Sequence, residues 1–219
     1  MHFSTVLFDL DGTLIDSIEL ILESYRHTLR VHRGASPPDA VWLEGLGTPL
    51  RKQFRHFTDD PAEIEAMVVT YRGWNLANHD RMVVAYPGAL ETVQALKARG
   101  AKLGIVTSKN LGGLQRGLAL CGFDGLFDSL VHCDSLPESK PDPAPVRLAL
   151  AELGAPPEEA LMVGDSPHDI ASGRDAGTRT AGCLWGPFDQ ERLLQERPDF
   201  LLTSFDDLAA LCNGPQDRA

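Results

Sequence analysis

Short apolar runs alternate with longer amphipathic stretches along most of this chain. The apolar runs have the length of β-strands, and they lie at Thr5–Phe8, Leu103–Val106, Ser129–Val131, Leu161–Val163, Thr180–Leu184 and Phe200–Leu202. The stretches between them predict helices at Gly88–Arg99, Leu111–Cys121, Pro143–Leu153, Asp169–Ala176 and Gln190–Glu196. Strands that alternate with helices form parallel sheets covered on both faces. The pattern therefore predicts an α/β fold with a Rossmann-like parallel sheet as its core.

One segment, residues 17–83, breaks the alternation. It has helical periodicity only, with one apolar stripe at Ile18, Ile21, Leu22, Tyr25 and Leu29 and another at Ile64, Met67, Val68, Tyr71 and Trp74. A helical stretch between them, Val41–Phe57, is interrupted at Gly45, Gly47 and Pro49. We expect an all-helical cap at 17–83, inserted by short hinge loops into an α/β core formed by 1–16 and 84–219.

Composition and charge narrow the classes of partner. The chain has 219 residues, is 43% apolar and carries a formal net charge of −11. This excess of acidic residues, without a run of Lys or Arg, disfavours nucleic acid as a partner. No apolar stretch is long enough to cross a membrane, and the N-terminus lacks a secretory signal pattern. The four cysteines form no CxxC pair, so we expect reduced thiols and a cytoplasmic protein.

Two aspartates follow the first predicted strand, in the sequence FDLDGTL. Alternate residues of an extended segment point the same way, so Asp9 and Asp11 face one site at the strand end, where α/β sheets bind ligands. A turn would account for Asp11 and Gly12 but not for Asp9. A calcium-binding EF-hand loop is excluded, because its glycine and glutamate positions hold Leu14 and Leu20. Phosphoryl transfer needs such a carboxylate pair, one as nucleophile and one for proton transfer.

Other predicted strand ends carry the remaining parts of a phosphoryl-transfer site. Thr107 and Ser108 offer hydroxyl and amide donors after the second strand. Lys140 lies in a proline-rich loop before a helix and offers a positive charge. Asp165 and Asp169, in the sequence GDSPHD, bring further carboxylates that suit a divalent cation.

These features together resemble the haloacid dehalogenase superfamily of phosphatases. The sequence DLDGT, the apolar run that ends at Thr107, Lys140 and the sequence GDSPHD match the four motifs of that family in order. The resemblance extends from the N-terminus to about Leu211. It implies an α/β catalytic core and a small helical cap that closes over the site and excludes water.

The resemblance also implies roles for single residues. Asp9 would be the nucleophile and Asp11 the general acid and base. Thr107 would bind the phosphoryl group, with backbone help from Leu10 and Ser108.

The same resemblance implies a cation site beside the nucleophile. Lys140 would pair with Asp9 and with the phosphoryl charge. Mg²⁺ would be held by the Asp9 carboxylate, the Asp11 backbone carbonyl and Asp165, and Asp169 would act directly or through water.

For residues of the cap and of the flanking loops, the sequence leaves two interpretations open: a contact with the substrate, or a structural or surface role. The loop Gly45–Pro49 is a candidate to face the substrate, and Arg51 is a candidate to bind an anionic tail, with a surface arginine as the alternative. The residues Arg72, Asn75 and His79 share one helix face, which is more typical of a solvated surface. A substrate contact by Lys109, and a phosphate contact or a turn role for Thr13, also stay open.

The expected function is a Mg²⁺-dependent phosphatase that hydrolyses small phosphate compounds through an aspartyl phosphate. Several segments resemble phosphoglycolate phosphatases, and the stretch Tyr71–Asp80 resembles the related bacterial inorganic pyrophosphatases, which form the first alternative. A sugar phosphomutase is the second alternative. A non-enzymatic phosphate-binding protein is disfavoured, because Asp9, Asp11, Lys140 and Asp165 are all present. The expected partner is a small phosphorylated substrate or pyrophosphate, and the chain would be a monomer or a homodimer.

Overall fold

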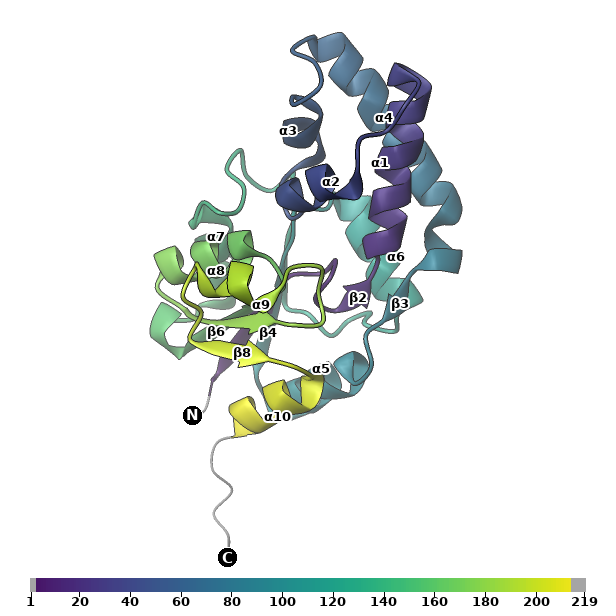
Figure 1. Ribbon diagram of the computed structural model, residues 1–219. Helices are drawn as coiled ribbons and strands as arrows, with labels where there is room; N and C mark the ends of the chain where they lie inside the picture. The colour runs from purple at the N-terminus through teal and green to yellow at the C-terminus, as the bar shows by residue number, and fades with distance from the viewer. Residues whose placement is uncertain (1–2, 214–219) are drawn as a thin grey trace, which may run out of the picture.

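The computed structural model describes residues 3–213 and consists of a parallel sheet with helices on both faces and a helical region above it (Figure 1). The main sheet is six-stranded, in the order β5-β4-β1-β6-β7-β8, and every neighbouring pair is parallel. The strands are β1 Thr5–Phe8, β4 Lys102–Val106, β5 Ser129–Val131, β6 Ala160–Gly164, β7 Arg179–Cys183 and β8 Phe200–Leu202. The predicted α/β fold is confirmed, with strand ends within one residue of those expected.

Helices cover both faces of this sheet because successive strand residues point to opposite sides. Val6 and Phe8 of β1 lie in one apolar cluster, whereas Leu7 lies in another on the opposite face. The core helices are α5 Ala89–Ala98, α6 Leu111–Leu120, α7 Ala144–Leu153, α8 Pro167–Ala176, α9 Gln190–Leu194 and α10 Phe205–Asn213, with a short 3-10 helix at Pro157–Glu159. The helices α7 and α8 pack together on the sheet, and α5 packs against α10 (Figure 1).

Three helices differ from the sequence expectation, and one of them, α9, ends at Leu194 rather than Glu196. Helix α8 begins at Pro167 rather than Asp169, because Ser166 caps it: the Ser166 side chain accepts from the Asp169 amide while the Asp169 side chain accepts from the Ser166 amide. Helix α10 was not predicted, although its buried residues Phe205, Leu208 and Cys212 lie at helical spacing.

The central strand β1 determines where the site lies. It pairs with β4 on one side and with β6 on the other, and Val6, Leu7 and Phe8 are fully buried. A parallel sheet brings the carboxyl ends of its strands to one edge. The residues that follow β1, β4 and β6 are therefore neighbours in space.

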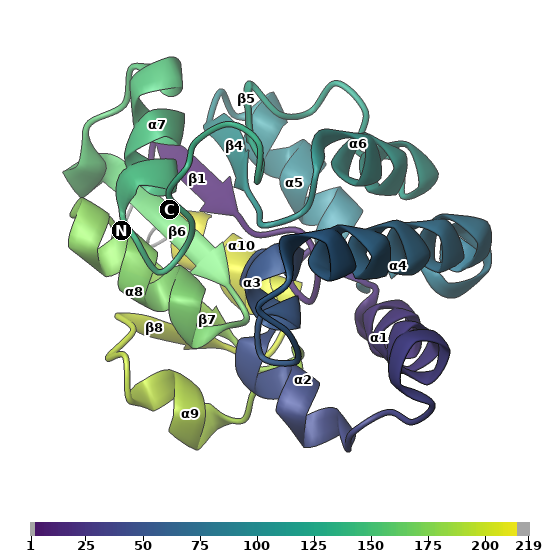
Figure 2. The ribbon, with the colours of Figure 1, turned by 90° about the horizontal axis from the view of Figure 1, so that it is seen from above.

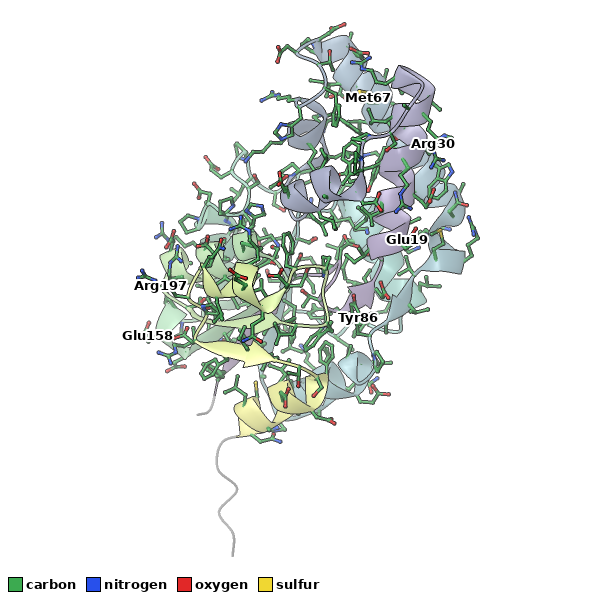
Figure 3. The ribbon with its side chains drawn as sticks, viewed as in Figure 1. Glu19, Arg30, Met67, Tyr86, Glu158 and Arg197 are labelled. Atoms are coloured by element: carbon green, nitrogen blue, oxygen red, sulfur yellow. The ribbon has the colours of Figure 1, made fainter. Side chains whose placement is uncertain are left out.

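Four helices form the region above this edge: α1 Ile18–Arg33, α2 Asp39–Gly45, α3 Leu50–Phe54 and α4 Pro61–Met82. The two long helices α1 and α4 pack together, and α3 lies over the carboxyl end of the sheet when seen from above (Figure 2). The core of this four-helix region includes the stacked rings of Tyr25 and Trp42, whose centroids are 4.3 Å apart, and the buried Met67 (Figure 3). We treat α1–α4 as the cap proposed from the sequence.

The two connections between cap and core form a small antiparallel sheet. Strand β2, Ile15–Asp16, pairs with β3, Val84–Ala85, and the Tyr86 amide donates to the Leu14 carbonyl just beyond them (Figure 3). The prediction that short loops form these boundaries is wrong. Strands of two residues are too short to show alternation in the sequence, and they form only because the fold brings their ends together.

Among residues 3–213, no helix is both long enough and apolar enough to cross a bilayer.

Candidate active site

Asp9 lies at the centre of the site, directly after β1. Its amide donates to the Val163 carbonyl at 2.9 Å, which holds the backbone against β6. The side chain is buried, and its Oδ1 lies 3.0 Å from Lys140 Nζ. That oxygen nevertheless receives no hydrogen bond of good geometry. Burial raises the pKa of Asp9 to about 7, against the attraction of Lys140 and with further repulsion from Asp169 and Asp11.

Lys140 is a buried cation between two carboxylates. Its ammonium group lies 2.5 Å from Asp169 Oδ1 and donates to the Val106 carbonyl at 2.8 Å. Burial by itself lowers the pKa of Lys140, but the charges of Asp169 and Asp9 outweigh that effect and raise it above the ordinary value. Lys140 therefore stays protonated beside Asp9.

Asp165 and Asp169 come from the end of β6 and the start of α8. Asp165 Oδ1 accepts from the Thr13 hydroxyl at 2.6 Å, whereas Asp169 Oδ2 accepts from the Ser166 hydroxyl at 2.6 Å. Asp9, Asp165 and Asp169 each offer an oxygen within 4.8 Å of the others. Burial and the nearby carboxylates raise the pKa of Asp165 well above its usual range. Such crowded carboxylates are most stable with a cation between them.

Glycines allow the backbone to approach these carboxylates closely. A Cβ on Gly12, whose φ is +86°, would lie 2.5 Å from Asp165 Oδ2. A Cβ on Gly186 would lie 2.3 Å from the Asp165 Cβ, and one on Gly164 would lie 2.2 Å from the Asp169 Cβ. Sequence reasoning missed Gly186, because nothing in its local sequence places it against Asp165.

Asp11 is tied to both the hinge and the core. Its Oδ1 accepts from the Ser17 hydroxyl at 2.5 Å and from Lys109 Nζ at 2.6 Å. Lys109 was open to a substrate contact from sequence, and here its amine is bound to Asp11. Ser17 was not recognised from the sequence, since a serine before a helix is most often read as a cap.

Thr107 and Ser108 follow β4 and lie beside the cap. Thr107 is buried, and its amide donates to the Val131 carbonyl at 2.9 Å. The Ser108 hydroxyl donates to the carbonyl of Gly47 at 2.6 Å, so the cap loop is in contact with the core. The phosphoryl-binding roles of Thr107 and Ser108 stay predictions.

A cleft of about 760 Å³ lies between cap and core. From the core it is lined by Asp9, Asp11, Thr107, Ser108 and Asp165, and from the cap by Gly47, Arg51, Arg72 and Asn75. Of the predicted catalytic, substrate-binding and metal-binding side chains, only Lys140 and Asp169 do not line it; Lys140 pairs with Asp9 and with Asp169. The candidates Thr13 and His79 also lie outside the lining.

The cap residues proposed from sequence have different surroundings. Arg51 is exposed at the cleft, and its guanidinium forms two contacts with the Glu65 carboxylate. His79, by contrast, is buried, with Nδ1 3.0 Å from Asp80 Oδ1. The helix face that carries Arg72 and Asn75 therefore borders the cleft, whereas His79 lies at the base of the cap.

Comparison with known proteins agrees with this geometry. The family model for haloacid dehalogenase-like hydrolases matches residues 6–183. The chain is 43% identical to pyrophosphatase PpaX of Anoxybacillus flavithermus over 211 residues, covering 96% of this chain and 97% of the relative. It is also 43% identical to pyrophosphatase PpaX of Bacillus pumilus over 208 residues, 95% of each chain.

Solved structures share the whole architecture. A predicted phosphoglycolate phosphatase from Haemophilus somnus aligns with a TM-score of 0.85 and 28% identity, covering 95% of this chain and 97% of that one. A predicted phosphatase from Clostridium acetobutylicum aligns with a TM-score of 0.84 and 26% identity, with coverage of 95% and 97%. The parallel sheet, the aspartates at the end of its central strand and these matches lead to one conclusion: the chain belongs to the haloacid dehalogenase-like hydrolase family, as a hydrolase of the phosphatase and pyrophosphatase type.

Proposed function

We propose that this protein is a Mg²⁺-dependent inorganic pyrophosphatase that acts through an aspartyl phosphate on Asp9. The observation that carries the proposal is Asp9 itself, a buried carboxylate between Lys140 and two further aspartates at the end of the central strand. The choice of pyrophosphate over other phosphates is supported by the 43% identity to PpaX pyrophosphatases over nearly the full chain.

The residues present fit a divalent cation. Hard cations such as Mg²⁺ prefer carboxylate oxygens, and Asp9, Asp165 and Asp169 offer three of them close together, with Asp9 Oδ1 buried and without a hydrogen bond. Asp169 already accepts from Lys140 and Ser166. The Asp9 and Asp165 carboxylates and the Asp11 backbone carbonyl would therefore hold the ion, and Asp169 would act through water. Bound Mg²⁺ would neutralise charge on the substrate and fix the orientation of its phosphoryl group.

The first half of the reaction transfers a phosphoryl group to the protein. An Asp9 carboxylate oxygen attacks one phosphorus of pyrophosphate and forms the new P–O bond. The bond from that phosphorus to the bridging oxygen breaks, and its electron pair leaves with the departing phosphate. Asp11 acts as the general acid that gives that phosphate a proton, while Lys140 and the Thr107 hydroxyl stabilise the charge on the transferred group.

The second half restores the protein. The Asp11 carboxylate takes a proton from a water molecule, whose oxygen attacks the phosphorus of the aspartyl phosphate. The bond between that phosphorus and the Asp9 oxygen breaks, which releases the second phosphate and regenerates the Asp9 carboxylate. Asp11 thus returns to its starting protonation state.

Phosphate release from pyrophosphate and from phosphoglycolate, measured side by side with Mg²⁺ and with a chelator, tests the proposal. We expect kcat/KM to favour pyrophosphate at least about tenfold, and both activities to stop reversibly in chelator. Phosphoglycolate is the second candidate, because a structural neighbour is a predicted phosphoglycolate phosphatase. A preference for phosphoglycolate would refute the assignment to pyrophosphate, and activity undiminished in chelator would remove Mg²⁺ from it.

Gly12→Ala tests the close approach to the cation site. The new Cβ would collide with the Asp165 carboxylate, so we expect Mg²⁺ to bind about 10- to 100-fold more weakly, measured as the Mg²⁺ concentration for half-maximal activity. Gly100→Ala is the matched control, because Gly100 has a similar φ of +82° but a Cβ added there would meet no atom within 4 Å. Equal effects in both variants would show backbone strain, not the collision, to be the cause.

A further inference from the structure

The basic side chains of the cleft differ in whether they are already neutralised. Four of them line it: Arg51, Arg72, Lys109 and Arg116. Three are paired with carboxylates: Arg51 with Glu65 at 2.9 Å, Lys109 with Asp11 at 2.6 Å, and Arg116 with Asp80 at 2.7 and 2.8 Å. Within residues 3–213, Arg72 has neither an ion pair nor a side-chain hydrogen bond.

Arg72 lines the cleft from α4 of the cap, in the same cavity as Asp9 and Asp11. Its neighbour on α4, Tyr71, is close enough to the catalytic aspartates that the Asp11 charge adds to burial in raising the pKa of the Tyr71 hydroxyl. Across the cleft, burial and Asp134 raise the pKa of Cys133 to about 11, and the positive charge of Arg72 acts against that rise. Arg72 and the loop residues Cys133 and Asp134, which follow β5, line the same cleft as Asp9.

The charge of the proposed substrate explains why the cleft would need a cation that is not already paired with a carboxylate. Pyrophosphate carries a second anionic phosphate beyond the one that is attacked, and an enclosed anion without a partner is costly. A guanidinium group offers two parallel N–H donors that match phosphate oxygens. The paired cations Arg51 and Arg116 would first have to leave a carboxylate, whereas Arg72 would not.

We propose that Arg72 binds the distal phosphate of pyrophosphate, the group that leaves when Asp9 attacks, and so selects diphosphates over phosphates with an uncharged tail. This inference rests on the proposed pyrophosphatase function. Because the distal phosphate gains charge as the bridging bond breaks, Arg72 stabilises the transition state as well as the bound substrate.

Two ligands that the protein cannot hydrolyse isolate this contact. Methylenediphosphonate carries both charged groups, whereas methylphosphonate carries only the one expected at Asp9. Calorimetry at fixed free Mg²⁺ should find that Arg72→Gln binds methylenediphosphonate about 10- to 100-fold more weakly and methylphosphonate with less than about a twofold change. Arg72→Lys should recover part of the loss, because it keeps the charge but not the paired donors.

Arg116→Gln is the matched control, since Arg116 also lines the cleft but is bound to Asp80. It should leave the ratio of the two affinities unchanged, even if cap closure weakens both. An unchanged ratio in Arg72→Gln would overturn the inference. The inference would also be overturned if Arg51→Gln, instead of Arg72→Gln, removed the preference for methylenediphosphonate. Arg51 would then be the residue that binds the distal group.

Turnover of pyrophosphate separates this inference from the proposed function. If the wild-type protein does not hydrolyse pyrophosphate but its diphosphonate preference depends on Arg72, the proposed function fails and the role of Arg72 stands. If pyrophosphate is hydrolysed and Arg72→Gln changes neither kcat/KM nor the diphosphonate preference, the function stands and the role of Arg72 fails.

Discussion

Replacing Asp9 by Asn is expected to abolish turnover while making the metal-free protein more stable. The amide cannot act as the nucleophile, so kcat should fall by at least about 10⁴-fold. The pKa of Asp9 is raised to about 7 in the folded protein, so its carboxyl group is most favourable when protonated. Its contribution to stability is complete below the ordinary value of 3.8 and is lost as the pH rises through about 7.

The neutral amide of Asp9→Asn avoids that loss. In chelator at pH 8, the free energy of unfolding should therefore rise, by up to roughly 4 kcal/mol. At pH 4 the difference between variant and wild type should be small. Mg²⁺ should stabilise the wild-type protein more than the variant, because the cation binds the ionised carboxylate.

Chemical denaturation at both pH values, with and without Mg²⁺, measures these differences. Asp124→Asn is the control, because Asp124 is an exposed aspartate outside the cleft, and it should change neither activity nor stability appreciably. Retention of near-normal turnover in Asp9→Asn would refute the aspartyl-phosphate mechanism. A marked loss of stability at pH 8 would show that the ion pair with Lys140 outweighs the cost of burying the carboxylate.

Replacing Lys140 by Met should have the largest effect on stability. The substitution keeps a similar side-chain volume but removes the cation that lies 3.0 Å from Asp9 and 2.5 Å from Asp169. Breaking a buried ion pair by removing one partner typically costs about 3–5 kcal/mol, because a buried charge is left uncompensated. We expect a loss of that size in the free energy of unfolding at pH 8, together with loss of turnover.

A surface ion pair provides the comparison. Lys97 pairs with Asp128, and both side chains are partly exposed, so Lys97→Met should cost less than about 1 kcal/mol. Circular dichroism should confirm that Lys140→Met is folded before its activity is measured. A stability loss for Lys140→Met no larger than that for Lys97→Met would contradict the structural role assigned to the buried lysine.

Local patterns predicted the core of the fold well, and the reason is physical. The strands of the parallel sheet are mostly buried on both faces, so they appear as short apolar runs such as Thr5–Phe8 or Ser129–Val131. The hydrophobic pattern did not predict β2 and β3, because each strand has only two residues. The cap separates the two strands in the sequence, and they pair with each other only in the folded chain.

For the candidate site too, local patterns predicted some residues and missed others. Asp9, Thr107 and Asp165 were identified because each directly follows an apolar run, and parallel strands end at one edge. The sequence did not predict that Ser17 binds Asp11 or that Gly186 lies against Asp165. Those contacts join positions with no local relation to each other, and only the folded chain brings them together.

The sequence by itself determined which reactive side chains follow the buried strands: carboxylates, a lysine and hydroxyl groups, with a helical segment inserted after the first strand. This information is local, because hydrophobic alternation and residue type are properties of short segments. Only the tertiary structure decided which charges are neutralised. Thr13 donates a hydrogen bond to Asp165, which is 152 positions away in the sequence. Lys109 is paired with Asp11, and Arg51 is paired with Glu65. Arg72 is left as the unpaired cation among the described residues of the cleft. Electrostatic pairing depends on distances in space, and sequence separation does not encode those distances.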